Sequence, residues 1–196
     1  MDANELIQQY RERRLTTLAL GDQIAEDRWR EPAISGGRSI HDLLAHIIAW
    51  DEWAAAVFDL SRVRDTLPSI LPDALRDPDA YNARHVARMQ NLTRDDVLAA
   101  LQEANPRVLK SAITGSGADW HLRRIADLAG IGPLAAPPSR QPTEEPPRAP
   151  TIGTILRVLM AHEAMHDQEV METFGIQPNL ERLRDPADGD ASQGTS

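Results

Sequence analysis

The segment from Thr151 to Phe174 constrains the fold more than any other part of the sequence. Its apolar residues recur every three or four positions, which is the period of an α-helix with one buried face. Thr151 follows a proline and can cap the start of this helix, and Gly175 suits the left-handed turn that ends a helix. His162 and His166 continue the apolar stripe. The segment therefore predicts a long helix that carries two imidazoles on its inward face.

The spacing of these two histidines favours a metal site. Side chains four residues apart on a helix lie one turn apart on the same side, so both rings can bind one ion. Neutral imidazole is a ligand for zinc, nickel and iron. The same pair could instead bond to buried neighbours or lie solvated on the flank of the helix.

Residues 162–166 also satisfy the literal H-E-x-x-H pattern of zinc metalloproteases. In those enzymes the third ligand lies further along the chain, and the site lies beside a sheet. No histidine follows His166, and we find no strand pattern nearby. Glu169 and Glu172 are too close in the sequence to supply the usual third ligand. An HExxH metalloprotease therefore stays a minor alternative.

Composition limits the partners of the chain. The formal net charge is -9 over 196 residues, which argues against a broad nucleic-acid face and against an anionic membrane surface. No apolar run is long enough to span a bilayer, and the N-terminal segment lacks the apolar region of a secretory signal. There is no cysteine, so disulfides and thiolate ligands are excluded. We expect a cytoplasmic protein that takes a small-molecule substrate or ligand and binds neither nucleic acid nor membrane.

Four regions have a helical period, and no region alternates like a strand. Three of them precede the segment already described, and prolines make the stretch before the third irregular. Short connections and a longer return are typical of an all-α four-helix bundle with a long crossover connection. The four predicted helical regions are residues 3–28, 39–60, 79–113 and 151–174, and the irregular stretch is 61–78.

Two pairs of residues have the spacing of a capping box, in which each side chain bonds to the backbone of the other. Ser39 with Asp42 marks the start of the second helical region, and Thr93 with Asp96 marks a fresh start within the third. His41 follows the first of these caps, and we expect it to be exposed.

The remaining segments lie outside the predicted bundle. Residues 114–150 form a long connection in which 120–129 can form a short helix. Its proline-rich part, 134–150, predicts an excursion at the surface before the last helix, which is either a lid or binding element or spare chain. Polar residues 176–196 predict a disordered tail. The domain is thus expected to span residues 1–175.

Three sequence features together resemble a known family. They are Trp29 with the short turn after it, the run RSIHDLLAHIIAWDEW, and the late run HEAMHDQEV. These features are similar to the DinB-like and DfsB-like metal-binding four-helix bundles, a superfamily that includes mycothiol-dependent maleylpyruvate isomerases. The similarity covers about residues 3–175. It implies that one histidine of the second helix and two residues of the last helix hold a divalent metal, which here are His46, His162 and His166.

The resemblance implies a metal-dependent enzyme. Three neutral nitrogens leave coordination positions open to water or substrate. A hydrolase would use an activated water, and a low-molecular-weight-thiol transferase or isomerase would bind a thiol cofactor, although no residue marks a site for such a thiol. A non-catalytic metal-binding or small-molecule-binding stress protein is the alternative. Such bundles can also pair through helix faces, so a homodimer stays open.

Three polar residues are candidates for acid–base or outer-shell roles near the metal: Asp51, Asn82 and Glu163. Each of them can equally be a solvated or helix-pairing side chain. Glu163 is adjacent to His162, so it points about 100° away around the helix. We therefore expect Glu163 to be an outer or surface group rather than a catalytic base.

Overall fold

The computed structural model describes residues 2–63, 70–114, 119–125, 128 and 149–183. These described residues form six α-helices and no strand, so the all-α prediction is confirmed. The helices are α1 (Ala3–Gln23), α2 (Ile40–Val63), α3 (Ile70–Arg76), α4 (Pro78–Met89), α5 (Arg94–Ile113) and α6 (Ile152–Phe174). None of them is both long and apolar enough to cross a membrane.

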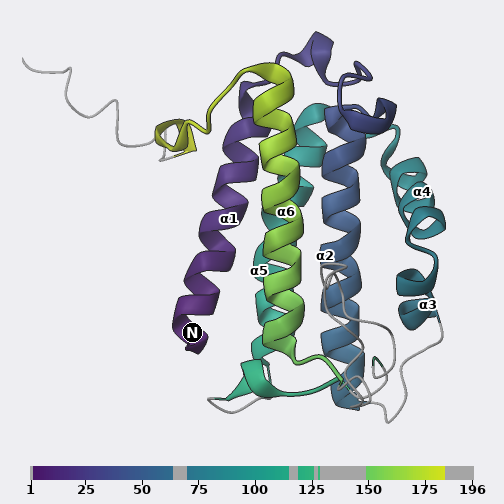
Figure 1. Cartoon of the computed structure of the whole chain (residues 1–196), viewed down its shortest axis with the longest axis vertical. Helices are drawn as coiled ribbons and strands as arrows, with labels where there is room; N and C mark the ends of the chain where they lie inside the picture. The colour runs from purple at the N-terminus through teal and green to yellow at the C-terminus, as the bar shows by residue number, and fades with distance from the viewer. Residues whose placement is uncertain (1, 64–69, 115–118, 126–127, 129–148, 184–196) are drawn as a thin grey trace, which may run out of the picture.

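Helices α1, α2, α5 and α6 pack as a bundle (Figure 1). Both α1 and α2 lie against α5 and against α6, so each long helix has two neighbours. The chain runs in one direction along α1 and α6 and in the opposite direction along α2 and α5 (Figure 1). Because α2 and α5 are parallel, the chain must return between them, and α3 and α4 make this return along the outside of α2. This return is the crossover connection that the sequence predicts.

The caps explain where the main helices begin and end. Both predicted capping boxes form, with bonds in both directions between the side chains and the backbone. The Thr151 hydroxyl accepts the Thr154 N–H at 3.1 Å, which satisfies one of the free N–H groups at the start of α6. Gly175 follows α6 with φ of 66°, a left-handed conformation that glycine adopts without steric cost.

Two boundaries differ from the prediction. Helix α1 ends at Gln23 and not at residue 28, and Glu26–Arg28 form a separate 3-10 turn after an extended Ile24. Residues 61–78 are not wholly irregular, because α3 and the start of α4 lie within them. Pro72 falls in the first turn of α3 and Pro78 is the first residue of α4, and a helix needs no proline N–H at these positions.

The regions outside the bundle are described only in part. Within 120–129, Trp120–Leu122 form a 3-10 turn and residues 123–125 are not helical, whereas 126, 127 and 129 lie outside the described residues. The predicted disordered tail contains a 3-10 turn at Leu180–Leu183, which packs against α1. The rest of that tail, residues 184–196, and nearly all of the proline-rich segment 134–150 lie outside the described residues.

The prediction that His41 is exposed is wrong. The connection between α1 and α2 folds over one end of the bundle and buries Trp29 and Ile34. The Trp29 carbonyl accepts the backbone N–H of His41 at 3.2 Å, and this contact holds the first turn of α2 beneath the connection. The His41 side chain is therefore buried.

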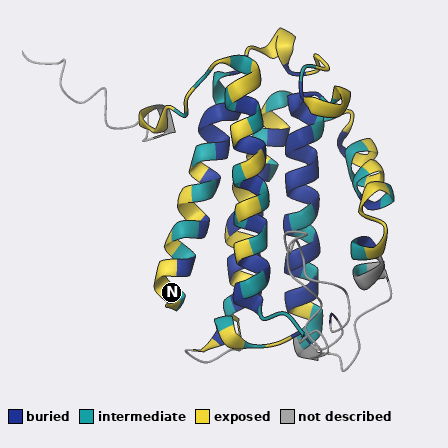
Figure 2. Cartoon of the chain, viewed as in Figure 1, coloured by how far each residue is buried: buried dark blue, intermediate teal, exposed yellow. Residues whose placement is uncertain are grey.

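Figure 2 shows that the long helices have buried faces. These faces contribute to two apolar clusters, one toward each end of the bundle. Tyr10 belongs to the first cluster and Leu18 to the second, and on α6 the same is true of Leu159 and Val170. Between these positions the helices carry buried polar side chains. The three histidines of the candidate metal site lie in this polar middle of the bundle.

Candidate metal centre

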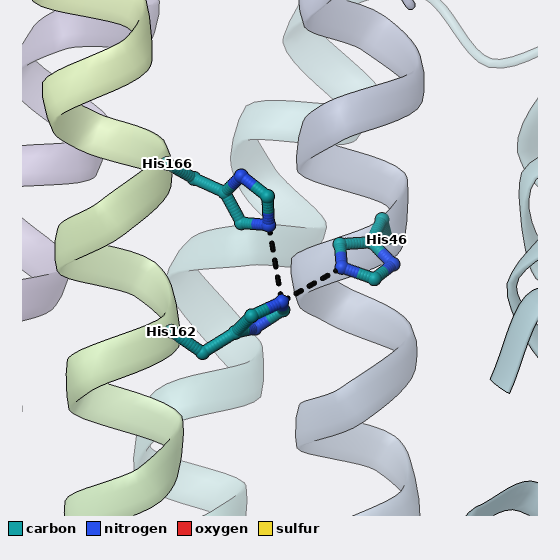
Figure 3. A group of neighbouring side chains, drawn as sticks. All are labelled: His46, His162 and His166. Atoms are coloured by element: carbon teal, nitrogen blue, oxygen red, sulfur yellow. Dashed lines mark hydrogen bonds between the residues drawn. The ribbon is translucent and has the colours of Figure 1, made fainter. Parts of the chain in front are cut away.

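Three imidazoles meet between α2 and α6 (Figure 3). The Nε2 atom of His162 lies 3.0 Å from Nε2 of His46 and 3.0 Å from Nε2 of His166. His46 and His166 are buried and His162 is half-buried. The potential ligand nitrogens all lie within 4.8 Å of one another, close enough to surround one ion. The structure thus brings together the three histidines of the predicted metal site, from segments far apart in the chain.

Glu169 fixes the orientation of His166. Its Oε2 atom lies 3.2 Å from the Nδ1 atom of His166, and the same oxygen pairs with the Arg38 guanidinium at 3.4 Å. A carboxylate only accepts hydrogen bonds, so the imidazole proton of His166 stays on Nδ1. The lone pair is then on Nε2, which faces the other two rings (Figure 3). A carboxylate behind a histidine is the usual second partner of a metal-bound imidazole.

Asn82 on α4 lies near His46. Burial lowers the pKa of His46, and the side chain of Asn82 opposes this effect. The Oδ1 atom of Asn82 is buried and makes no hydrogen bond among the described residues. The second nitrogen of His46 points away from the other two rings (Figure 3), so a proton held there leaves the Nε2 lone pair facing His162.

The three rings are neutral at physiological pH. Burial lowers the pKa of His46, His162 and His166 to about 4 each. Neighbouring imidazoles and the Arg38 guanidinium lower these pKa values further, and Glu169 opposes the shift at His166. Neutral imidazole is the protonation state that binds metal, because its lone pair is free.

This arrangement fits a bound cation better than it fits hydrogen bonds among the rings. The Nε2 atoms of His46 and His166 both point at one nitrogen of His162, and that of His166 carries a lone pair. A single hydrogen on that nitrogen cannot lie along both 3.0 Å contacts. At least one of these two contacts therefore brings two nitrogens together without a hydrogen bond between them. Burial also disfavours an additional proton at this position. A divalent cation between the rings would accept all three lone pairs.

A cavity of about 620 Å³ adjoins the cluster between α2, α4 and α6. His46 and His162 line it, whereas His166 lies behind them. Most of the other lining side chains are apolar, including Trp50 and Trp53. The volume is that of a site for a small molecule. One side of the imidazole cluster is therefore accessible to a ligand, and Asn82 lies on the same wall.

The other two candidate residues lie in a different cluster. The Asp51 carboxylate accepts hydrogen bonds from the Tyr10 hydroxyl at 2.7 Å and from Nη2 of Arg14. The Glu163 carboxylate accepts from Nε of Arg14 at 2.9 Å and from the Thr17 hydroxyl at 2.6 Å. Arg14 also donates to a carbonyl oxygen of α5 at 2.9 Å, so it joins all four bundle helices. We call these five side chains the Arg14 layer.

Glu163 is buried in this layer and is not a surface group. Burial raises the pKa of its carboxyl group, and Arg14 lowers it again. The H-E-x-x-H reading requires the glutamate to face the metal and the substrate. Here the carboxylate binds α1 on the other side of α6, so the geometry does not support a metalloprotease.

Sequence reasoning missed two residues at the centre of these clusters. Glu169 lies three positions after His166, and this spacing places both side chains on one face of a helix. Arg14 continues the buried stripe of α1 from Tyr10 to Thr17, and a charge in such a stripe requires a buried partner. Both signals are visible in the sequence, but the partners on other helices are not.

Comparison with known proteins agrees with this geometry. The model of the DinB superfamily matches residues 9–170, which include all three histidines and most of the chain. Neither the curated proteins nor the solved structures contain a match to this sequence. On the strength of the family match, this chain belongs to the DinB superfamily.

Proposed function

We propose that the chain is a divalent-metal-dependent enzyme that acts on a small molecule, either as a hydrolase or as a low-molecular-weight-thiol transferase. The observation that carries this proposal is the convergence of three neutral imidazole nitrogens, two of them 3.0 Å from the third, at the edge of a cavity. His46, His162 and His166 would hold the ion. Zinc, nickel and iron all suit such a set of nitrogens.

A divalent ion held there would supply Lewis acidity, which lowers the pKa of a water or thiol ligand toward neutrality. The protein supplies the rest of the site. Glu169 holds a proton on the outer nitrogen of His166, so that its inner lone pair faces the other two rings, and Asn82 lies near His46. The apolar walls around Trp50 and Trp53 exclude water from a bound substrate.

The hydrolase and the thiol transferase differ in what occupies the cavity. A hydrolase needs room for one substrate, whereas a thiol transferase must hold a thiol cofactor and an acceptor side by side. A cavity of about 620 Å³ can hold a drug-sized ligand. Both activities are therefore tested together.

The test uses protein purified without a histidine tag, in metal-free form and after loading with zinc, nickel or ferrous iron. Steady-state rates are measured on small esters and amides, and on transfer from a low-molecular-weight thiol to an electrophile. We expect turnover in one of these classes only with metal. The double variant His162→Ala/His166→Ala should lose it, and the control His121→Ala, which changes a histidine outside the cluster, should keep it.

Turnover that survives in the double variant would contradict the proposed mechanism. Metal binding without any turnover would instead support a non-catalytic protein that holds a metal or small molecule.

A further inference from the structure

The cavity beside the histidines carries one strongly basic side chain. Among the described residues that line it, Arg157 is the only arginine, lysine, aspartate or glutamate. Arg157 lies five residues before His162 on α6, which is a rise of about 7.5 Å and a turn of about 140° around the helix, and both side chains line the cavity from its two edges. A ligand that reaches both the histidines and Arg157 must therefore span at least this rise.

The guanidinium of Arg157 is free to bind a ligand. Its side chain is exposed, and no hydrogen bond or ion pair joins it to another described residue. Several other arginines, including Arg13, Arg38 and Arg88, pair with carboxylates. The chain has 30 acidic and 21 basic residues, so acidic partners for arginines are plentiful. Arg157 has no such partner among the described residues, although it lies at the cavity.

The wall between the two ends is apolar and rigid. Trp50 and Trp53 lie edge to face with ring centroids 5.7 Å apart, and the ring centroids of Tyr81 and Trp50 are 5.2 Å apart. The indole N–H of Trp53 donates to the Leu71 carbonyl at 2.7 Å, which fixes that ring. Ring faces and edges held in this way suit a flat apolar group.

We propose that the cavity selects an amphipathic anion whose carboxylate pairs with Arg157, whose apolar body lies against Trp50 and Trp53, and whose far end faces His46 and His162. Arg157 thus determines the charge of the substrate, and the tryptophans determine its shape. The role of the far end rests on the proposed function. The pairing with Arg157 does not, because it needs no metal.

Three probes of the same shape separate charge from shape: 3-phenylpropionate, 3-phenylpropanol and 3-phenylpropylammonium. Their affinities are measured by calorimetry on the wild-type protein and on Arg157→Gln, in metal-free and zinc-loaded forms. We expect the anion to bind about 5- to 10-fold more tightly than the alcohol, and the ammonium to bind most weakly, since a charge-assisted pair at a partly exposed site has about this strength. In Arg157→Gln the anion and the alcohol should bind equally.

Arg11→Gln is the matched control, because Arg11 is exposed on α1, does not line the cavity and carries the same charge. It should keep the wild-type preference, and Arg157→Glu should reverse it in favour of the ammonium. The proposal is overturned if Arg157→Gln keeps the preference for the anion, or if none of the probes binds. A preference that appears only with zinc and survives Arg157→Gln would assign the carboxylate to the metal and would also overturn it. If the chain binds no metal, the preference should persist unchanged.

Discussion

Two polar clusters lie in the middle of the bundle, and consecutive residues of α6 belong to them. Glu163 belongs to the Arg14 layer, in which one buried guanidinium binds two carboxylates. Each carboxylate also accepts a hydrogen bond from a hydroxyl of α1, and the contacts of Arg14 involve all four bundle helices. His162 enters the imidazole cluster, in which three neutral rings meet and no side chain of the described residues brings a cation between them. The first cluster therefore has its own charge partner. The second has none among the described residues and could hold a metal ion.

The electrostatics of the two clusters support this reading. Burial alone would lower the pKa of Arg14, but Asp51 and Glu163 raise it above its usual value, so the guanidinium stays charged. Burial lowers the pKa of the imidazoles to about 4, so they stay neutral. One cluster therefore keeps its own positive charge, and the other excludes protons while leaving its lone pairs available.

The largest effect on stability is expected from Arg14→Leu. This change leaves Asp51 and Glu163 buried without their cation, which should cost about 3–5 kcal/mol in the free energy of unfolding. Urea denaturation measures the loss. Adding Asp51→Asn and Glu163→Gln to the same variant should recover part of it. A loss below about 1 kcal/mol would show that the Arg14 layer is not the structural unit described above.

His162→Ala should weaken metal binding strongly and change the stability of the metal-free protein little. Removal of a ligand should lower zinc affinity by at least about 100-fold, since loss of an outer partner alone costs about 10- to 100-fold. The free energy of unfolding of the metal-free protein should change by less than about 1 kcal/mol, because this ring is half-buried and its 3.0 Å contacts with His46 and His166 cannot both be hydrogen bonds. Competition with a chromophoric chelator measures the affinity. An unchanged affinity would remove this ring from the site.

Acid should destabilise the metal-free protein through the imidazole cluster. The folded rings titrate near 4 and the unfolded ones near 6.5, so the unfolded chain binds more protons between these values. Stability is thus fully present above pH 6.5 and is lost as the pH falls toward 4, by on the order of 3 kcal/mol for each ring that gains a proton on unfolding. Urea denaturation at several pH values measures this loss. His162→Ala/His166→Ala should show a shallower loss, and an identical slope in both proteins would contradict the assignment.

The smallest effect is expected from Glu169→Gln. The amide keeps an oxygen near Nδ1 of His166 but loses the negative charge, so zinc affinity should fall by about 10-fold. Glu172→Gln is the matched control on the same helix, because Glu172 is exposed and bonds only to Gln168 among the described residues. Equal affinities for the two variants would mean that Glu169 does not orient the ligand.

The sequence predicts the bundle well because its signals are local. The period of α6, its cap at Thr151 and its stop at Gly175 all lie within one segment, and each is confirmed. The spacing of His162 and His166 is local in the same sense. The third ring, His46, comes from the resemblance to a family, because periodicity alone does not single it out on α2.

The remaining features depend on contacts between helices. Glu163 and Asp51 are polar residues on buried helices. Both of them pair with Arg14 of α1, and the sequence alone does not show that this arginine lies between them. His41 is buried because a separate connection folds over it. The cavity that Arg157 lines is formed by residues of α2, α4 and α6 together, so no single segment of the sequence predicts it.

Titration of metal-free, untagged protein with zinc shows whether the imidazole cluster holds an ion, with the heat of binding and the metal content of the dialysed product as readouts. We expect one ion per chain in the wild-type protein and none in His162→Ala/His166→Ala. Wild-type protein that retains no zinc, nickel or iron, or a double variant that binds as the wild type does, would contradict this expectation.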